Sequence, residues 1–309
     1  MGAPLRVQAA IAGWLAVLAA GSCRSPDAEV APNALSPAAT AGASSSPAAP
    51  PPLPVLRAST PSSAAASVPL PVVATDWCID GLTPLDEETC YLLPDPADAA
   101  VPPPLLVYLH GIVPPTPTSP QKERVELAVL HAARRAHAAA LVPRGVRGIG
   151  PSGAHDWWAW PTDPGAYAKY AAGMVAKWAD ARRRLERLAG APFAHTYLAG
   201  SSNGAYFLTA LALRGDLESL GFPVDGYGAM SGGSAGGRAA SALPAVHLPF
   251  YVGYGTYDES TRRGARALAA LLEQAQWPTK RSELPFGHGA REEYLDEAFA
   301  FWAREALTR

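Results

Sequence analysis

A glycine- and serine-rich stretch beyond the middle of the chain has the spacing of an activated serine. Gly200, Ser202 and Gly204 are spaced as G-x-S-x-G. A serine hydroxyl is a poor nucleophile until a neighbouring base takes its proton, and that base needs an acid to orient it and stabilise its charge. If Ser202 is a nucleophile, a histidine and an acidic residue elsewhere in the chain must therefore converge on it.

A second stretch fits the same pattern, so the flanking sequence has to decide between the two. Gly232, Ser234 and Gly236 are also spaced as G-x-S-x-G. Ser202 follows the strand-like TYLAG and precedes the helix-like AYFLTALAL, whereas Ser234 precedes a short Gly-rich segment. Because a nucleophile of this type sits on a tight turn between a strand and a helix, the sequence favours Ser202 and predicts a surface loop at Ser234.

The acid and the base are expected after later strands. Asp258 follows the apolar run 248–253, and His288 lies between two glycines after the last predicted strand. An alternative for Asp258 is an N-cap of the helix that begins near Thr261. Glu259 and Asp225 rank below Asp258 as the acid. The other histidines considered are interpreted as surface or packing residues, namely His131, His137, His195 and His247.

The negative charge that develops on a carbonyl oxygen during attack needs backbone donors already in place. One predicted donor is the amide of Asn203, directly after the nucleophile. The other is expected in His110-Gly111-Ile112, which follows the apolar run LLVYL. Ile112 is the first choice for this donor and Gly111 the second.

The elements that position these residues alternate along the chain. Apolar runs predict strands, and apolar spacing of three and four residues predicts helices between them. Strands alternating with helices indicate a mostly parallel sheet with helices on both faces, which binds its ligand at the carboxyl ends of the strands. The predicted strands are 89–93, 105–109, 140–143, 195–200, 226–230, 248–253 and 280–284, and the predicted helices are 119–139, 167–188, 205–214, 262–276 and 291–307.

Four short motifs in order, YLHG, GSSNG, GTYD and FGHG, resemble the α/β-hydrolase superfamily. The layout is similar to secreted esterases of the polyhydroxybutyrate depolymerase and feruloyl esterase type. The resemblance implies a three-layer α/β-hydrolase fold and a serine hydrolase that cleaves small-molecule or polymeric carboxylic esters through an acyl-enzyme, without cofactor or metal. The alternatives are a serine peptidase on the same fold and a non-catalytic binding lipoprotein.

Three tryptophans between the predicted second helix and the strand before it have two interpretations. Trp157, Trp158 and Trp160 either line an acyl or aromatic subsite at the mouth of the site or cap the core beneath a long loop. Upstream, Gly148, Gly150 and Gly153 match G-x-G-x-x-G. We interpret this match as chance because no helix is predicted to open there.

The N-terminal quarter of the chain has the composition of targeting and tether segments. Residues 1–23 contain one positive residue, an apolar run and a small-residue stretch before Cys23, which predicts a signal peptide that resembles a lipoprotein signal, with Cys23 lipidated. Plain signal cleavage and an uncleaved anchor are the alternatives. Residues 24–74 are rich in Ala, Pro and Ser and predict a disordered linker. The sequence thus predicts an exported protein, lipid-anchored to a membrane or else periplasmic or secreted, whose hydrolase domain spans 75–309.

Charge and cysteines narrow the function further. The formal net charge is −2 and no basic run stands out, which argues against a nucleic-acid partner. Cys78 and Cys90 flank a turn-rich segment in a chain predicted to be exported, so we expect a disulfide across an N-terminal hairpin. A redox pair or metal site is disfavoured because the C-x-x-C spacing and nearby histidines are missing.

Overall fold

The computed structural model describes residues 77–95, 102–116 and 118–308. The predicted signal peptide (1–23), the lipidation residue Cys23 and the predicted linker (24–74) lie outside the described residues. Of the helices in the described ranges, none combines the length and the apolar character needed to cross a membrane.

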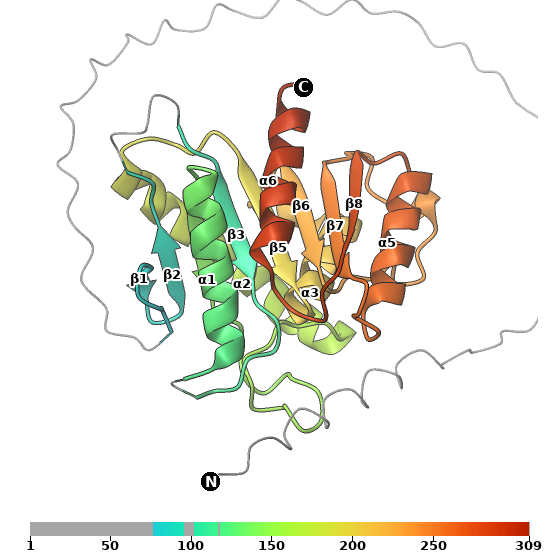
Figure 1. Ribbon diagram of the computed structural model, residues 1–309, viewed down its shortest axis with the longest axis horizontal. Coiled ribbons are helices and arrows are strands. Elements are labelled where there is room, and N and C mark those ends of the chain that lie inside the picture. The colour runs from blue at the N-terminus through green and yellow to red at the C-terminus, as the bar shows by residue number, and fades with distance from the viewer. Residues whose placement is uncertain (1–76, 96–101, 117, 309) are drawn as a thin grey trace, which may run out of the picture. The chain divides into compact units, whose positions relative to one another are not determined.

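Within these ranges, one eight-stranded sheet has the order β1-β2-β4-β3-β5-β6-β7-β8 (Figure 1). β2 is antiparallel to both of its neighbours, and from β4 to β8 every adjacent pair is parallel. All residues of β3 to β7 are buried, as expected for strands covered on both faces. The strands are Thr83–Asp86 (β1), Thr89–Leu92 (β2), Leu105–Leu109 (β3), Ala139–Pro143 (β4), Thr196–Ser201 (β5), Gly226–Met230 (β6), Phe250–Gly255 (β7) and Thr279–Leu284 (β8).

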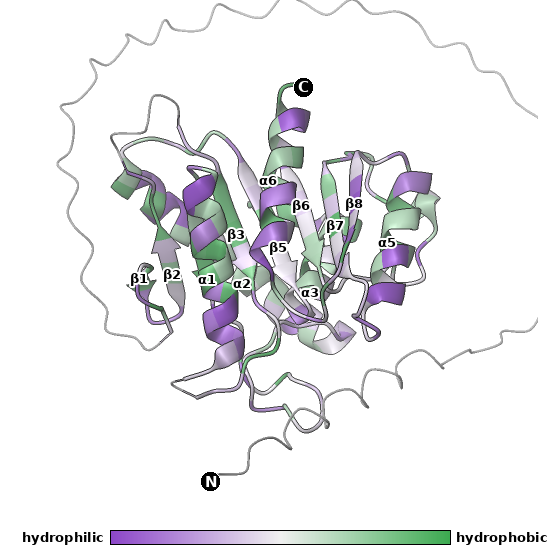
Figure 2. Cartoon of the chain, viewed as in Figure 1, coloured by the Kyte–Doolittle hydropathy of each residue, from purple (hydrophilic) through white to green (hydrophobic). Residues whose placement is uncertain are grey.

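Helices cover both faces of this sheet. Successive side chains of a strand point to opposite faces, so an apolar strand presents apolar side chains on both faces, and both need cover. Buried side chains of α2, α3 and α5 belong to the same core cluster as Leu105, Val107 and Leu109 of β3, whereas those of α1 and α6 belong to the cluster that contains Leu106 and Tyr108. In Figure 2 the helices of both layers carry hydrophilic bands, and the strands between them are mostly apolar or pale. The helices are Pro120–Arg135 (α1), Pro164–Ala189 (α2), Asn203–Arg214 (α3), Asp216–Ser219 (α4), Arg262–Gln274 (α5) and Glu292–Ala306 (α6), with a 3-10 turn at Ala240–Ala242 (η3).

This arrangement is the predicted α/β-hydrolase fold, a mostly parallel sheet between two helical layers. The helix ends follow the expected chemistry. The Ser119 hydroxyl accepts the Lys122 amide at 3.4 Å ahead of Pro120, so α1 begins as predicted. α2 ends at Gly190 in the left-handed conformation, with φ 74°, and α3 ends at Gly215, with φ 70°.

Two predictions about element boundaries are wrong. α1 ends at Arg135 instead of near residue 139, and His137 stands outside the helix in a left-handed conformation with φ 47°. The alanines that follow are buried, and Ala139 already pairs with Leu105 of β3, so burial in the sheet outweighs their helix propensity. The predicted turn-rich segment also contains a strand, because Thr83–Asp86 pairs with β2 as an edge strand.

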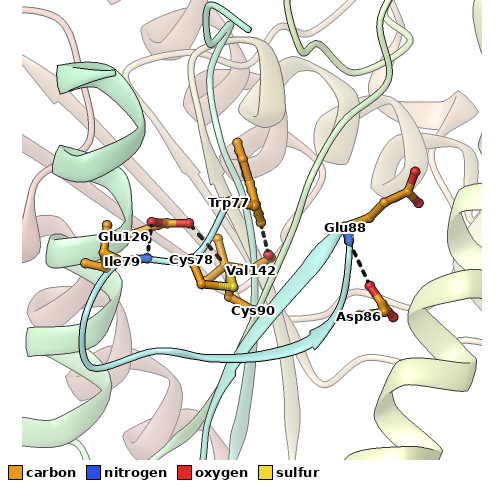
Figure 3. Close-up of a disulfide and its surroundings, with 8 residues drawn as sticks. All are labelled: Trp77, Cys78, Ile79, Asp86, Glu88, Cys90, Glu126 and Val142. Carbon is orange, nitrogen blue, oxygen red and sulfur yellow. Dashed lines mark hydrogen bonds between the residues drawn. A yellow bond between two sulfur atoms is a disulfide. The ribbon is translucent and has the colours of Figure 1, made fainter. Parts of the chain in front are cut away.

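The predicted disulfide is present. Cys78, in the turn before β1, is bonded to Cys90 in β2, with 5.5 Å between their Cα atoms. The carboxyl group of Glu126, on α1, lies beside it (Figure 3): one oxygen accepts the Ile79 amide at 3.1 Å, and the other is 3.6 Å from the Cys90 sulfur. The disulfide, β1 and β2 thus attach the N-terminal edge of the described chain to α1 and β4.

Candidate active site

Ser202 lies on the sharp turn between β5 and α3, with φ 51° and ψ −120°. A positive φ is strained for a residue with a side chain, and such strain clusters at functional sites. A Cβ atom on Gly200 would lie 2.7 Å from the carbonyl oxygen of Leu109, and one on Gly204 would approach the same oxygen more closely than real Cβ atoms do. Glycine is therefore required on both sides of Ser202, which has the predicted context of strand, turn and helix.

The second G-x-S-x-G match has a different place in the fold. Ser234 lies in a loop after β6, where its hydroxyl accepts the Gly236 amide at 3.0 Å. Gly232 packs directly against the Ser202 turn, because a Cβ atom there would lie 2.7 Å from the Ser202 carbonyl oxygen. Of this second motif, Gly232 thus packs against the Ser202 turn, and Ser234 is a loop residue as predicted.

The imidazole of His288 bridges Ser202 and Asp258. Its Nε2 atom lies 2.9 Å from the Ser202 hydroxyl oxygen, and its Nδ1 atom lies 2.9 Å from Oδ2 of Asp258. Ser202 follows β5, Asp258 follows β7 and His288 follows β8, so three parallel strands end at the same edge of the sheet. The structure therefore brings together the three residues that the sequence singled out for nucleophile, base and acid.

Asp258 is almost fully buried, and its oxygens accept several hydrogen bonds. Oδ2 accepts from the Thr261 hydroxyl at 2.5 Å as well as from His288, and Oδ1 accepts from the Ser260 hydroxyl at 2.7 Å and the Thr261 amide at 3.1 Å. Burial opposes ionisation, but the hydrogen bonds from His288, Thr261 and Ser260 outweigh it and lower the pKa of Asp258 below its usual value. A carboxylate held ionised in this way suits the orientation of an imidazole.

Asp258 is not the N-cap of the helix, the alternative interpretation, because Thr261 holds that position in α5. The Asp258 carboxylate instead closes the turn that precedes the helix. Its Oδ1 atom accepts the Thr261 amide just ahead of α5, while Oδ2 faces His288. Ser260 and Thr261 are site residues that were not predicted from the sequence. The signal for them was present, because an aspartate followed closely by serine and threonine favours local hydrogen bonds of this type.

A third residue that the sequence did not reveal, Ser231, anchors the His288 loop. The hydroxyl of Ser231, at the end of β6, donates to the carbonyl oxygen of Gly289 at 3.0 Å. Ser231 is buried with φ 45°, and its amide donates to Gly253 of β7 at 2.8 Å. The residue next to His288 is thus tied to the sheet, which limits how far the imidazole can move.

The segment predicted to supply an oxyanion donor lies against the nucleophile. A Cβ atom on Gly111 would be 3.2 Å from Cβ of Ser202, so this segment runs beside the turn. Asn203 is the first residue of α3, and its amide has no acceptor within the helix. Gly111 and Asn203 therefore lie beside Ser202, and Ile112 follows Gly111 in the chain. The donor roles of these amides stay predictions.

His110 fixes the orientation of that segment. Its Nε2 atom accepts the Gly145 amide at 2.8 Å, so the proton is on Nδ1, which donates to the Gly111 carbonyl oxygen. Burial lowers the pKa of His110 to about 4, which keeps the ring neutral at physiological pH. Because a trans peptide places C=O and N–H on opposite sides, the Ile112 amide points away from His110.

The prediction that Trp160 contacts substrate is wrong. Trp160 is 1% exposed, and its ring stacks on that of Phe207 with 6.0 Å between the ring centroids. Its indole N–H donates to the His110 carbonyl oxygen at 2.8 Å. The Asn203 side chain also pairs with the Trp160 backbone, through bonds of 2.6 and 3.3 Å. Trp160 is a core residue that connects the tryptophan loop to α3, which is the second of the two interpretations.

Trp157 and Trp158 are half-buried, so they keep accessible surface. The Trp158 backbone pairs with Val113, next to the oxyanion segment, and the Arg144 guanidinium lies 4.0 Å from the Trp158 ring centroid. The upstream G-x-G-x-x-G match lies in loop, with no helix at Gly153, as interpreted from the sequence. In the described ranges, His, Cys, Asp and Glu side chains form no group of three that could hold a metal ion.

No family model matches the sequence, and no curated protein matches it. Similar solved structures are esterase PE8, at 21% identity over 70% of this chain and 96% of that chain with a TM-score of 0.49, and the Bacillus cereus carboxylesterase, at 16% identity over 70% and 93% with a TM-score of 0.47. Zea mays acyl-protein thioesterase 2 is 15% identical over 70% and 97%, with a TM-score of 0.47. Likeness at this level carries no conclusion about substrate.

Proposed function

We propose that the protein is a serine hydrolase that cleaves carboxylic esters through an acyl-enzyme intermediate. The observation that supports this most is the chain of two 2.9 Å contacts from the Ser202 hydroxyl through His288 to Asp258. This geometry lets the imidazole take a proton from the hydroxyl while Asp258 stabilises the resulting positive charge. The strained turn holds the hydroxyl within reach of the base.

In the proposed reaction, the Ser202 oxygen attacks the ester carbonyl carbon while its proton moves to Nε2 of His288. The Ile112 and Asn203 amides donate to the oxygen that becomes negative, with Gly111 as the alternative donor. The tetrahedral intermediate collapses, the ester C–O bond breaks, and His288 returns the proton to the leaving alcohol. Water then attacks the acyl-enzyme with the same base, releasing the acid and restoring Ser202.

A serine peptidase on this fold and a non-catalytic binding lipoprotein are the competing functions. The binding role is disfavoured because all three side chains are present and in contact. Comparing matched ester and peptide substrates separates an esterase from a peptidase. Within esterases, the polyhydroxybutyrate depolymerase and feruloyl esterase types give two substrate classes to test first, a polyester and a hydroxycinnamate ester.

The test of function is hydrolysis of a short para-nitrophenyl ester by the wild type, Ser202→Ala and Ser234→Ala. Ser234 is the matched control because it has the same sequence pattern and lies in a loop. We expect Ser202→Ala to lose at least about a thousandfold in kcat, and Ser234→Ala to stay within about twofold. Equal activity of the wild type and Ser202→Ala would reject Ser202 as the nucleophile.

We also propose that the protein is exported and attached to a membrane through a lipid on Cys23. The support is the sequence alone, a short apolar run followed by small residues and Cys23. Cells fed radiolabelled palmitate should label the wild type and leave Cys23→Ala unlabelled. Label on both proteins, or on neither, would contradict lipidation of this cysteine.

A further inference from the structure

A small pocket with basic side chains lies beside the segment that carries the proposed oxyanion donors. Its volume is about 100 Å³, enough for a carboxylate or phosphate group and too small for a large ring system. Among the described residues that line it there is no Asp or Glu. Side chains with a positive charge, an aromatic ring or a hydroxyl dominate the lining, namely Lys122, Arg144, Arg147, Trp77, Trp158 and Thr116.

The arginines of this pocket lie against tryptophan rings. The Arg144 guanidinium lies 4.0 Å from the Trp158 ring centroid and 5.9 Å from that of Trp77. Arg147 lies 5.5 Å from the Trp158 centroid, and its guanidinium bonds to Asp156. A stacked guanidinium keeps its N–H donors in one plane, the geometry that pairs with carboxylate and phosphate oxygens.

The third cation, Lys122, is only 6% exposed. It lies in the first turn of α1, two residues after Pro120, and lines the pocket together with the arginines. Its charge also acts on Glu126 of the same helix. Water screens a charge on a mostly buried side chain less than one on an exposed side chain, so an anion in the pocket interacts more strongly with it.

The pocket is joined to the active site through short covalent and hydrogen-bonded links. Arg144 precedes Gly145, whose amide donates to His110, and the Arg144 charge contributes to lowering the pKa of His110. On the other side, Pro114 of the lining is three residues from Gly111, which packs against Ser202. Three residues span at most about 11 Å, so Pro114 lies within about that distance of Gly111.

We propose that this pocket binds an anionic group of the substrate, a carboxylate or a phosphate, a few bonds from the ester that Ser202 attacks. This inference rests on the proposed function and names the substrate class: esters of molecules that carry a second, charged acid group. The pocket provides binding energy at a distance from the reacting carbonyl, and that energy fixes the substrate for attack.

Binding is measured first, in a form that does not depend on turnover. Full-length Ser202→Ala protein is titrated by calorimetry with two uncleaved amides, the para-nitroanilide of adipic acid, which keeps one free carboxylate, and that of hexanoic acid. We expect the charged ligand to bind at least about tenfold more tightly than the neutral one. Adding Arg144→Gln should remove that preference, and Arg263→Gln, an exposed arginine on α5, should preserve it.

Turnover is then compared for mono-para-nitrophenyl adipate and para-nitrophenyl hexanoate, which have the same number of acyl carbons. The ratio of kcat/KM for the charged ester to that for the neutral ester should exceed one, fall with added salt, and drop at least about tenfold in Arg144→Gln. Arg147→Gln gives a second variant, with a smaller drop, should Arg144→Gln fail to fold. A monophosphate ester of similar length shows whether phosphate replaces carboxylate.

The outcomes separate this inference from the proposed function. Cleavage of both esters with a ratio near one, insensitive to salt and to either arginine, would overturn the anion site and leave the esterase standing. Absence of cleavage with tighter, Arg144-dependent binding of the charged amide would overturn the esterase and support the anion site. Equal binding of the two amides would overturn the anion site whatever the turnover.

Discussion

At the scale of residues, the ionised state of Asp258 depends on neighbours that carry no reaction step. Thr261 supplies two of its hydrogen bonds, one from the hydroxyl to Oδ2 and one from the amide to Oδ1. The hydroxyl bond goes to the oxygen that also faces His288. Thr261 is therefore a positioning residue for the acid.

Thr261→Val should weaken catalysis while keeping the shape of the side chain. Loss of one hydrogen bond to a charged group lowers kcat by about tenfold, because Asp258 holds His288 less firmly. Thr261→Ser, which keeps the hydroxyl, should restore most of kcat, and KM should change little in either variant. An equal loss in the serine and valine variants would show that the threonine acts through packing.

At the scale of elements, the Ser202 turn is tightly packed against β3. Gly204 is in the first turn of α3, and a Cβ atom there would collide with the carbonyl oxygens of Leu109 and His110. A Cβ atom on Gly173, in α2, would instead have no heavy atom of another residue within 4 Å, apart from its chain neighbours and its own helix backbone. The two glycines therefore form a matched pair for testing whether the packing at the turn has the geometry described.

Gly204→Ala should lower the free energy of unfolding by about 2–4 kcal/mol, because backbone atoms cannot move aside as a side chain can. Gly173→Ala should raise it by about 0.5–1 kcal/mol, because alanine is the better helix former. Urea unfolding of both variants beside the wild type measures the difference. Destabilisation of the same size in both would contradict the close contact at Gly204.

Much of the fold followed from patterns that are local in the sequence. Buried strands are mostly apolar runs, and Ser202, Asp258 and His288 each stand within a few residues of the end of a strand, so their places along the chain put them at one sheet edge. The roles of Ser231 and of the His110 ring escaped prediction because they depend on bonds to Gly289 and Gly145, which are distant in sequence. The end of α1 was missed for a related reason, since sheet burial overrode alanine propensity.

At the scale of the whole molecule, one buried acid couples stability to pH. Glu126 is fully buried beside the disulfide, and burial raises its pKa to about 8 from 4.5, partly opposed by Lys122 and the Ile79 amide. The folded protein therefore keeps a proton that the unfolded chain loses. Between about pH 4.5 and 8 the contribution of Glu126 to stability should decrease as pH rises, and above pH 8 it should level off.

Glu126→Gln should reduce this dependence, because a neutral amide resembles the protonated acid and still accepts the Ile79 amide. We expect the variant to be more stable than the wild type by several kcal/mol at pH 8, because a pKa difference of one corresponds to about 1.4 kcal/mol, and by less than about 1 kcal/mol at pH 5. Thermal unfolding at the two pH values is the measurement. A difference between variant and wild type that is the same at both values would show that Glu126 does not titrate in this range.

Mass spectrometry of the protein after reaction with a fluorophosphonate tests the assignment of Ser202 most directly. The probe bonds covalently to a serine oxygen that a neighbouring base activates. We predict a single adduct on the peptide that contains Ser202, and its loss in His288→Ala, in which the base is missing. An adduct on Ser234, or an undiminished adduct on Ser202 in His288→Ala, would contradict the account.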